Sequence, residues 1–293
     1  MWLLQNYITA RKSYALVGGK DGRLNTVKLN VPAKIISWIY IVAVISVGVP
    51  YFSVISTSLI NLRGIGFKAG NFTFQHYVEL FTENKKGIQA ILNSFILAVC
   101  AATICAVLGT LLVLAVRNSK SRLKKAVEAM GMLPEMLPSI VLVIGIMLFW
   151  NKIYNIIPLY NTFGIMILAY VVLFLPCTIQ YVTSLFTQIS SSLISAGQVF
   201  GGSPFYIFRR MTLPLISKGV LTGWMMTFII AFRELVTASL IAPPNTLVVS
   251  TYIVREFEQG SVSVGMAMAV LCVLFTTTAL LILNTVIDKQ KGR

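Results

Sequence analysis

Few side chains of this sequence could do chemistry. Its 293 residues include only nine acidic residues, scattered along the chain, and a single histidine, His76. The four cysteines, Cys100, Cys105, Cys177 and Cys272, all fall in apolar runs, where a free thiol behaves as a small hydrophobic group. No pair of them has the spacing of zinc ligands. We therefore expect no metal site and no catalytic residue in this chain.

Nucleotide chemistry is also not expected. Gly18-Gly19-Lys20 lacks the full pattern GxxxxGK[ST] that cradles phosphate groups, so we interpret it as a loop. No nucleophile and base stand in a credible pair, and a membrane-embedded enzyme would need clustered His, Asp or Glu. The sequence predicts that this chain is not an enzyme.

One charged pair, Arg233-Glu234, interrupts an apolar stretch. A charge in mid-membrane costs about 2.5 to 3.5 kcal/mol on insertion scales, so such residues usually face a bundle interior or a water-filled cavity. Adjacent helical residues point about 100° apart, so each needs its own partner. Two interpretations stay open: a place on a substrate pathway, for Glu234 more than for Arg233, or a structural role near the outer membrane interface.

Composition predicts the elements that must position these residues. The chain is 57% hydrophobic and 11% charged, with a mean hydropathy of +0.83, whereas soluble domains carry roughly a quarter charged residues. We expect an all-α, polytopic membrane protein, because a span needs roughly 20 apolar residues. The predicted spans are about six in number: 35–60, 90–116, 136–150, 162–183, 219–240 and 265–287.

The basic residues predict the orientation of these spans. Of the 24 Lys and Arg residues, seventeen lie in the N-terminal segment, the connection after residue 116, the segment before residue 219 and the C-terminal tail. Six lie in the connections on the opposite side, and the last is Arg233. Cytoplasmic connections carry the excess of Lys and Arg, so both termini are predicted to be cytoplasmic. The net charge of +15 is then a topology signal, and no nucleic-acid partner is expected.

The segment 191–215, SSLISAGQVFGGSPFYIFRRMTLPL, is predicted to be a helical hairpin on the cytoplasmic side. Residues 193–200 form its first helix, and Gly201-Gly202 supply a turn that needs unusual backbone angles. Ser203-Pro204 then start a second helix, with a capping hydroxyl and a proline at the first position. This helix is expected to end near Leu213-Pro214. A hairpin so short needs a membrane or a protein to support it.

The same segment resembles the EAA loop of permease subunits from binding-protein-dependent ABC importers, whose pattern is E-A-A, three residues, G, nine residues, I-x-L-P. Here Ser195-Ala196-Gly197 stand at E-A-A, Gly201 at the glycine, and Met211-Thr212-Leu213-Pro214 at I-x-L-P. The spacing matches throughout, while Ser195 replaces the acid, Gly197 an alanine and Met211 an isoleucine. The resemblance implies a coupling loop that docks on a separate ATPase. It assigns coupling roles to Ser195, Ala196, Gly197, Gly201, Met211, Leu213 and Pro214.

Two further stretches resemble parts of this family. Residues 232–271 are similar to permeases for iron(III), thiamine, polyamines and aminoethylphosphonate, with the iron(III) type closest through Glu234-Leu235, Pro243-Pro244 and Glu258-Gln259-Gly260. Residues 1–34 resemble the connector before the second half of fused iron(III)-type permeases. We therefore expect a basic cytoplasmic segment over 1–34 and a transmembrane domain over 35–290, either as a separate subunit or as half of a double permease.

The resemblance implies a type I ABC importer permease in a bacterial inner membrane. Its expected partners are a second permease domain, ATPase subunits that hold ATP and Mg²⁺, an extracytoplasmic binding protein and the lipid bilayer. No cofactor is expected in this chain, and the substrate is iron(III) or another small solute that the binding protein selects. The alternative is a secondary transporter driven by an ion gradient, which predicts broken helices at the bilayer midplane in repeat-related pairs.

Overall fold

The computed structural model describes residues 31–82, 85–118, 124–189 and 191–291, and most of the predicted segment 1–34 lies outside them. Within these ranges the chain is helical and contains no strand, only an isolated bridge between Ile60 and Phe72. The chain divides into two compact units, residues 1–50 and 51–293. The predicted all-α class is confirmed.

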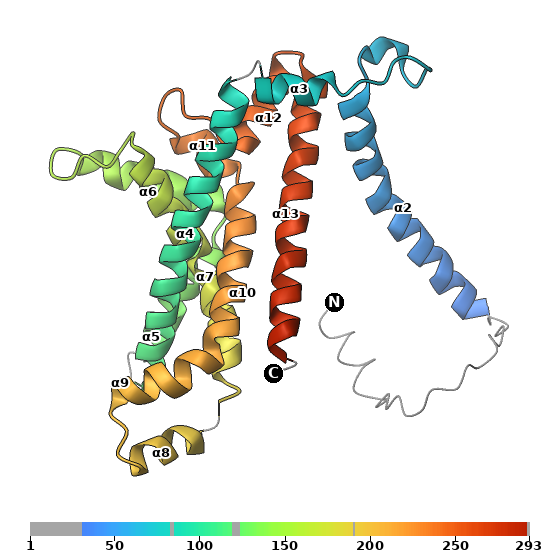
Figure 1. Cartoon of the computed structure of the whole chain (residues 1–293). Helices are drawn as coiled ribbons and strands as arrows, with labels where there is room; N and C mark the ends of the chain where they lie inside the picture. The colour runs from blue at the N-terminus through green and yellow to red at the C-terminus, as the bar shows by residue number, and fades with distance from the viewer. Residues whose placement is uncertain (1–30, 83–84, 119–123, 190, 292–293) are drawn as a thin grey trace. The chain divides into compact units, whose positions relative to one another are not determined.

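Among the described residues, five helical stretches are long and apolar enough to cross a membrane (Figure 1). They are Lys34–Leu59, Lys85–Val116, Phe163–Phe186, Pro204–Phe232 and Val262–Ile282. Four of them belong to α2 (Val31–Leu59), α4 (Lys85–Asn118), α7 (Phe163–Phe186) and α13 (Val262–Lys291), and Pro204–Phe232 runs from the second arm of the hairpin through α10 (Leu213–Phe232).

The predicted span 136–150 is wrong as a single helix. Met136 ends α5 (Lys124–Met136), and α6 (Ser139–Lys152) begins after a bend of 109°. The cause is Pro138, because a proline disfavours helical backbone at the residue before it; Pro138 itself has ψ 130°. The 14 residues of α6 rise only about 21 Å, less than a bilayer core of about 30 Å. A count of six spans requires that the bent pair be one span.

The predicted span 219–240 is also interrupted. Helix α10 ends at Phe232, and a separate short helix, α11 (Val236–Ile241), follows. The stretch 241–264, predicted to be an outer loop, contains α12 (Val249–Glu258). The stretch 61–89, predicted to be polar and exposed, contains η1 (Arg63–Ile65), α3 (Gln75–Thr82) and the start of α4. Both connections are therefore folded structures.

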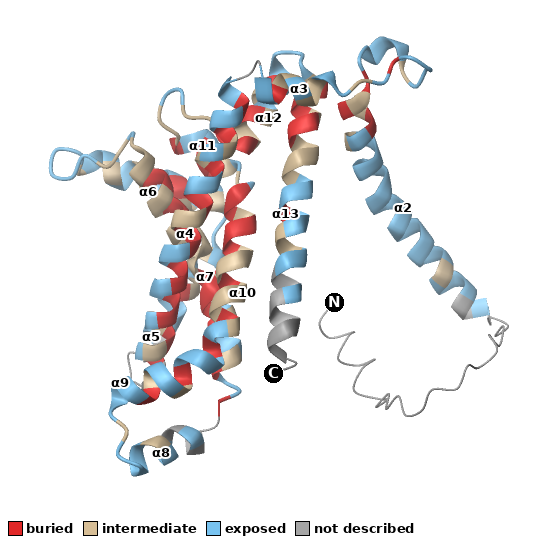
Figure 2. Cartoon of the chain, viewed as in Figure 1, coloured by how far each residue is buried: buried red, intermediate tan, exposed pale blue. Residues whose placement is uncertain are grey.

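The core of the larger unit lies where α4, α7 and α10 pack on one another (Figures 1 and 2). Helix α4 contributes mainly small side chains and α7 and α10 larger ones. Among those buried are Leu97, Ala98, Ala101 and Ala102 of α4, Met166 and Ala169 of α7, and Phe228 and Phe232 of α10. Alanines on α4 let its backbone approach the other two helices closely, the usual way in which membrane helices pack.

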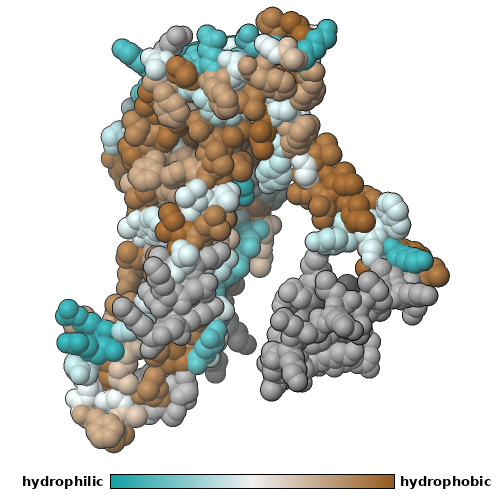
Figure 3. Space-filling model, turned by 45° about the vertical axis from the view of Figure 1, so that its right-hand side comes forward, coloured by the Kyte–Doolittle hydropathy of each residue, from teal (hydrophilic) through white to brown (hydrophobic). Residues whose placement is uncertain are grey.

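The larger unit has two distinct ends. The hairpin and the C-terminal end of α13 lie at one end, and α3, α11 and α12 lie at the other (Figure 1). On the face drawn in Figure 3, apolar side chains are prominent between the two ends of this unit, and strongly hydrophilic ones are seen at both ends. This distribution suits helices that cross a membrane.

Candidate functional site

The first arm of the hairpin ends in a turn that only a few residue types can form. After α8 (Ser191–Val199), Gly202 N donates to Gly197 O and Gly201 N donates to Gln198 O, both at 3.0 Å. This pair of bonds is the Schellman motif, whose central residue is left-handed. Gly201 has φ 79°, a left-handed backbone conformation that is strained for most residues other than Gly and Asn. The turn lies where the sequence predicts it.

The second arm begins as predicted but does not end where predicted. Ser203 Oγ accepts from Tyr206 N at 3.2 Å, and Pro204 starts α9 (Pro204–Ile207). Instead of ending near Leu213-Pro214, the arm passes through a π-helical turn, Phe208–Thr212, and continues into α10. In that turn Leu213 N donates to Phe208 O, five residues back. The wider turn moves the carbonyl that a proline would otherwise strike, so Pro214 is accommodated.

Close contacts hold the two arms together. A Cβ added at Gly197 would lie 2.9 Å from Met211 Sδ, and one added at Gly202 would lie 2.8 Å from Gly197 O. Ile207 is buried between the arms and would contact either Cβ. Two departures from the EAA pattern, Gly197 and Met211, are therefore in contact with each other. Sequence reasoning placed Gly202 in the turn but did not single out Ile207.

The turn of the hairpin is flanked by exposed apolar side chains. The predicted residues Ser195, Ala196, Gly201, Leu213 and Pro214 are all exposed. The most exposed large hydrophobic side chains described in the hairpin lie on either side of the turn: Val199 is 84% exposed, Phe200 90% and Phe205 70%. In the sequence, the signal for this surface is the presence of Val199, Phe200 and Phe205 in an otherwise moderately polar segment. Exposed apolar clusters indicate interaction sites.

Behind the hairpin, α7 and α10 pack backbone against backbone. A Cβ at Gly219 would lie 2.9 Å from Tyr181 O, and a Cβ at Gly223 would lie 3.2 Å from Thr178 Cα. Thr178 and Thr227, both fully buried, share a hydrogen bond of 3.1 Å between hydroxyls. Gly219 and Gly223 have the GxxxG spacing of close membrane-helix contacts, a signal that our sequence analysis did not use.

Helix α4 joins the same crossing. A Cβ added at Gly109 would lie 3.1 Å from Thr178 Cγ2. Thr178 is thus enclosed between α4 and α10, and three helices meet at one residue. Both helices that flank the hairpin pass through this crossing and are in close contact there.

Arg233 and Glu234 lie in the break between α10 and α11, not within a continuous helix. Glu234 Oε2 accepts from Thr237 N at 2.9 Å, and Ser250 Oγ donates to Glu234 O. The half-buried carboxylate of Glu234 therefore caps α11, while Arg233 is exposed. The structure does not bring this pair near the hairpin; the pair lies at the opposite end of α10.

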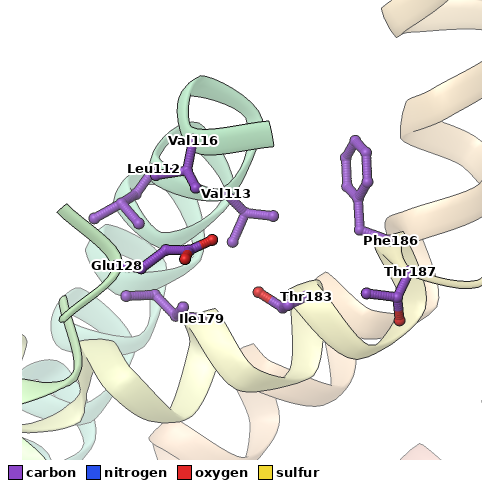
Figure 4. Close-up of a pocket in the computed structure, with 8 residues that line it drawn as sticks. All are labelled: Leu112, Val113, Val116, Glu128, Ile179, Thr183, Phe186 and Thr187. Atoms are coloured by element: carbon purple, nitrogen blue, oxygen red, sulfur yellow. The ribbon is translucent and has the colours of Figure 1, made fainter. Parts of the chain in front are cut away.

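A cavity of about 290 Å³ lies at the hairpin end of the bundle, between α4, α5 and α7 (Figure 4). Glu128 and Thr183 point into it from α5 and α7, and Leu112, Val113 and Ile179 form apolar walls. Phe186 and Thr187, at the end of α7, line it as well. A cavity therefore lies near the start of the hairpin, whereas the helices are closely packed at Thr178.

Metal-ligating side chains do not gather among the residues that the structure describes. Within those ranges no three His, Cys, Asp or Glu side chains could hold one metal ion. The candidate site is a hairpin that lies between α7 and α10 and is continuous with α10.

The described residues thus form helices long enough to span a membrane, with a surface hairpin between two of them. Residues 106–293 match the family described as the binding-protein-dependent transport system inner membrane component, and the chain belongs to that family. This confirms the predicted class, an importer permease of the inner membrane and not an enzyme.

Three relatives are identical to this chain at about a quarter of the aligned residues. The Fe(3+)-transport permease FbpB 2 of Haemophilus influenzae is 26% identical over 80% of this chain but only 43% of its own length. The spermidine/putrescine permease PotC of the same species is 25% identical over 82% of this chain and 91% of its own. The putative 2-aminoethylphosphonate permease PhnV of Salmonella typhimurium is 24% identical, over 82% and 89%. The chain thus spans less than half of the first relative.

Solved structures show the same fold. A bacterial ABC transporter that imports alginate matches with a TM-score of 0.68 at 19% identity, over 86% of this chain and 96% of the other. The methionine transporter MetNI, in an inward-facing form, matches with a TM-score of 0.57 at 15% identity, over 69% and 94%. These likenesses confirm the ABC importer permease fold that the sequence predicts.

Proposed function

We propose that this chain forms part of the translocation pathway of an ABC importer. Its partners are a second permease domain, two ATPase subunits that hold ATP and Mg²⁺, and an extracytoplasmic binding protein. The observation that carries the proposal is the hairpin, preformed between α7 and α10 within the family-matched region. One solved relative, the alginate importer, is described in complex with a substrate-bound periplasmic protein. The domain assignment follows: a cytoplasmic segment over 1–34 and the transmembrane domain over 35–290.

The hairpin is the contact with the ATPase in this proposal. Ser195, Ala196, Gly197, Gly201, Met211, Leu213 and Pro214 build it, and ATP-driven closure of the ATPase pair displaces it. Because Gly219 and Gly223 press α10 against α7, both helices move with the hairpin as one body. The displacement reaches the far end of α10, where Arg233 and Glu234 lie. Such rigid-body switching between two packings is a common form of conformational change.

The contact with the ATPase includes an apolar part, since Ser195 stands where the family has an acid and Phe200 is the most exposed of the large hydrophobic side chains described in the hairpin. Burying a phenylalanine stabilises a contact by about 1.5 to 3 kcal/mol. Phe200→Ser should therefore lower the affinity of the permease for its ATPase by about ten- to a hundredfold.

The measurement for Phe200→Ser is co-purification of the ATPase from detergent, followed by titration of the purified subunits. Ile156→Ser is the matched control, because Ile156 is 80% exposed but lies after α6, away from the hairpin. Equal affinity for wild type and Phe200→Ser would contradict the assignment of the hairpin.

The proposed orientation places the hairpin and both termini in the cytoplasm. A membrane-impermeant thiol reagent applied to intact cells should label Gln259→Cys, on the end of α12, and leave Ser195→Cys unlabelled; both positions are exposed. Inverted vesicles should give the opposite pattern, and the unmodified chain measures the background from its four native cysteines. Labelling of Ser195→Cys from outside would overturn both the orientation and the coupling role.

Glu234 is the proposed pathway residue at the outer end. Glu234→Gln keeps an oxygen that can cap α11 but removes the charge. If substrate passes this carboxylate, uptake should fall about tenfold, the equivalent of one charge-assisted hydrogen bond of roughly 1.5 kcal/mol. The amount of inserted protein should stay unchanged, and Arg233→Gln should have a smaller effect. Unchanged uptake kinetics would leave Glu234 with the capping role alone.

The proposed substrate is iron(III), with a polyamine and an aminoethylphosphonate as the competing candidates that the relatives suggest. Since the described residues offer no three-ligand metal group, iron would be selected by the binding protein and only passed on by the permease. Deleting the chain and measuring uptake of each labelled solute separates the three. Loss of polyamine uptake with iron uptake intact would overturn the iron assignment.

An ion-driven carrier is the second candidate, because two helix pairs, α5–α6 and α10–α11, are broken, as that class predicts. Family membership favours the ATP-driven importer. Collapse of the ion gradient should leave uptake intact in vesicles that contain ATP, whereas an ion-driven carrier would stop.

A further inference from the structure

The connection after α2 is a compact loop, residues 61–74, which we call the outer aromatic loop. A single buried side chain, Asn71, holds it. Asn71 Nδ2 donates to Leu62 O at 2.9 Å and to Gly66 O at 2.8 Å, and its Oδ1 accepts from Leu62 N at 2.9 Å. Backbone bonds between Asn61 and Asn71 and between Thr73 and Leu59 close it. A loop with this internal bonding has a defined shape and fixed side-chain positions.

The loop displays phenylalanines that packing inside the chain does not bury. Phe67 is 63% exposed and Phe74 is 73%, and Phe72 is also exposed. The Phe67 ring is stacked on that of Phe52 with centroids 6.2 Å apart, and it lies 6.4 Å from the ring of Phe72. Contiguous exposed apolar groups of this kind mark an interaction surface.

The stacking with Phe52 shows which way the loop folds. Phe52 belongs to the apolar stretch Lys34–Leu59 of α2 and lies seven residues before its end, about 10 Å along the axis at 1.5 Å per residue. A ring stacked on Phe52 therefore lies beside the span and not beyond it. The loop turns back alongside the last turns of α2, where the exposed rings of Phe67 and Phe52 adjoin each other.

The opposite side of the loop is polar and fixed to the bundle. Ser263 Oγ and His76 Nε2 both donate to Ile60 O at 3.1 Å, and Ser58 shares a hydrogen bond of 2.7 Å with Tyr77. A hollow of about 390 Å³ lies on this side. Its lining includes Arg63, His76 and Glu79 and the turn before α13, and excludes the three phenylalanines of the loop.

We propose that the outer aromatic loop lies in the membrane interface and anchors the outer end of α2 in lipid. Phe67, Phe72 and Phe74 contact the upper acyl chains, and the polar hollow faces water. Phe side chains on one face of an amphipathic segment insert into the boundary between headgroups and acyl chains, while the polar face stays in water. Lipid is favoured over a soluble protein partner because Phe67 stacks on Phe52, an exposed residue of the apolar stretch Lys34–Leu59.

Photo-crosslinking tests this directly in the intact transporter in native membranes. Phe67→p-benzoylphenylalanine keeps an aromatic ring at the position, and mass spectrometry identifies what it captures. We expect phospholipid adducts, in about tenfold excess over the same probe at Gln259 on the end of α12. Phe74→p-benzoylphenylalanine should also capture lipid, so the test does not depend on successful incorporation of the probe at residue 67 alone.

Two further results decide the outcome. Asn71→Ala, which removes the bonds that shape the loop, should reduce lipid capture at residue 67, while lipid capture at Ile39, an exposed residue inside the α2 span, persists. Capture of the binding protein, or of a second permease chain, in place of lipid would overturn the proposal. None of these readouts depends on the hairpin or on ATP, so they succeed or fail separately from the proposed coupling.

Discussion

Gly201→Val should abolish coupled uptake while the protein still inserts into the membrane. Gly201 has φ 79° and nothing within 4 Å of an added Cβ, so the substitution acts through backbone strain and not through a clash. A left-handed residue costs roughly 1 to 2 kcal/mol when it carries a Cβ, and β-branching adds to this. Relief of the strain requires loss of the turn and of the bonds to Gly197 and Gln198, which changes the angle between the arms of the hairpin.

The measurement is ATP-driven uptake in vesicles together with the amount of ATPase bound. Gly201→Asn is the matched control, because asparagine tolerates left-handed backbone better than other residues with a side chain. We expect Asn to retain most uptake and Val to lose at least about tenfold. Normal uptake by Gly201→Val would remove the hairpin turn from the coupling mechanism.

Gly219→Val is expected to have an equally large effect by a different route. Its Cβ would lie 2.9 Å from Tyr181 O and 3.0 Å from the Leu185 side chain. A backbone oxygen cannot rotate away, so α10 must separate from α7. Overpacking of this kind typically costs about 1 to 3 kcal/mol, and it disrupts the close approach near Thr178 that ties both helices to the hairpin.

Gly145→Val supplies the control, since Gly145 lies within α6 and has nothing within 4 Å of an added Cβ. We expect Gly219→Val to lower the midpoint temperature of thermal unfolding in detergent and to uncouple ATP hydrolysis from transport. Gly145→Val should do neither. If Gly219→Val hydrolysed ATP and transported solute in the normal ratio, the two helices would not need to move as one body.

The sequence predicted those features of the hairpin that depend on the backbone preferences of single residues. The turn at Gly201 and the cap at Ser203 followed from the conformational needs of single residues, and the structure places them accordingly. The end of the second arm did not follow. Leu213-Pro214 suggested a helix end, because a proline usually stops a helix. A π-helical turn at Phe208–Thr212 removed that conflict, and nothing in the residue types announces such a turn.

By itself the sequence determined the helical class, the membrane location, four of the spans to within a few residues of each end and the start of the hairpin. These depend on the length of apolar stretches and on the backbone preferences of Gly, Ser and Pro, which act over a few residues. The sequence also carried the spacing that resembles the family.

Only the tertiary structure decided where helices break and which surfaces meet. The end of α10 at Phe232, beside the contact of Glu234 with Ser250, and the crossing at Thr178 involve contacts between residues distant in sequence. The outer aromatic loop also became evident only in the structure. Its sequence is polar near Asn61 and Arg63, and nothing in it indicated that the Asn71 side chain would hold the loop together. A side chain's environment is set by neighbours that only the packed chain brings together, and local preference cannot specify them.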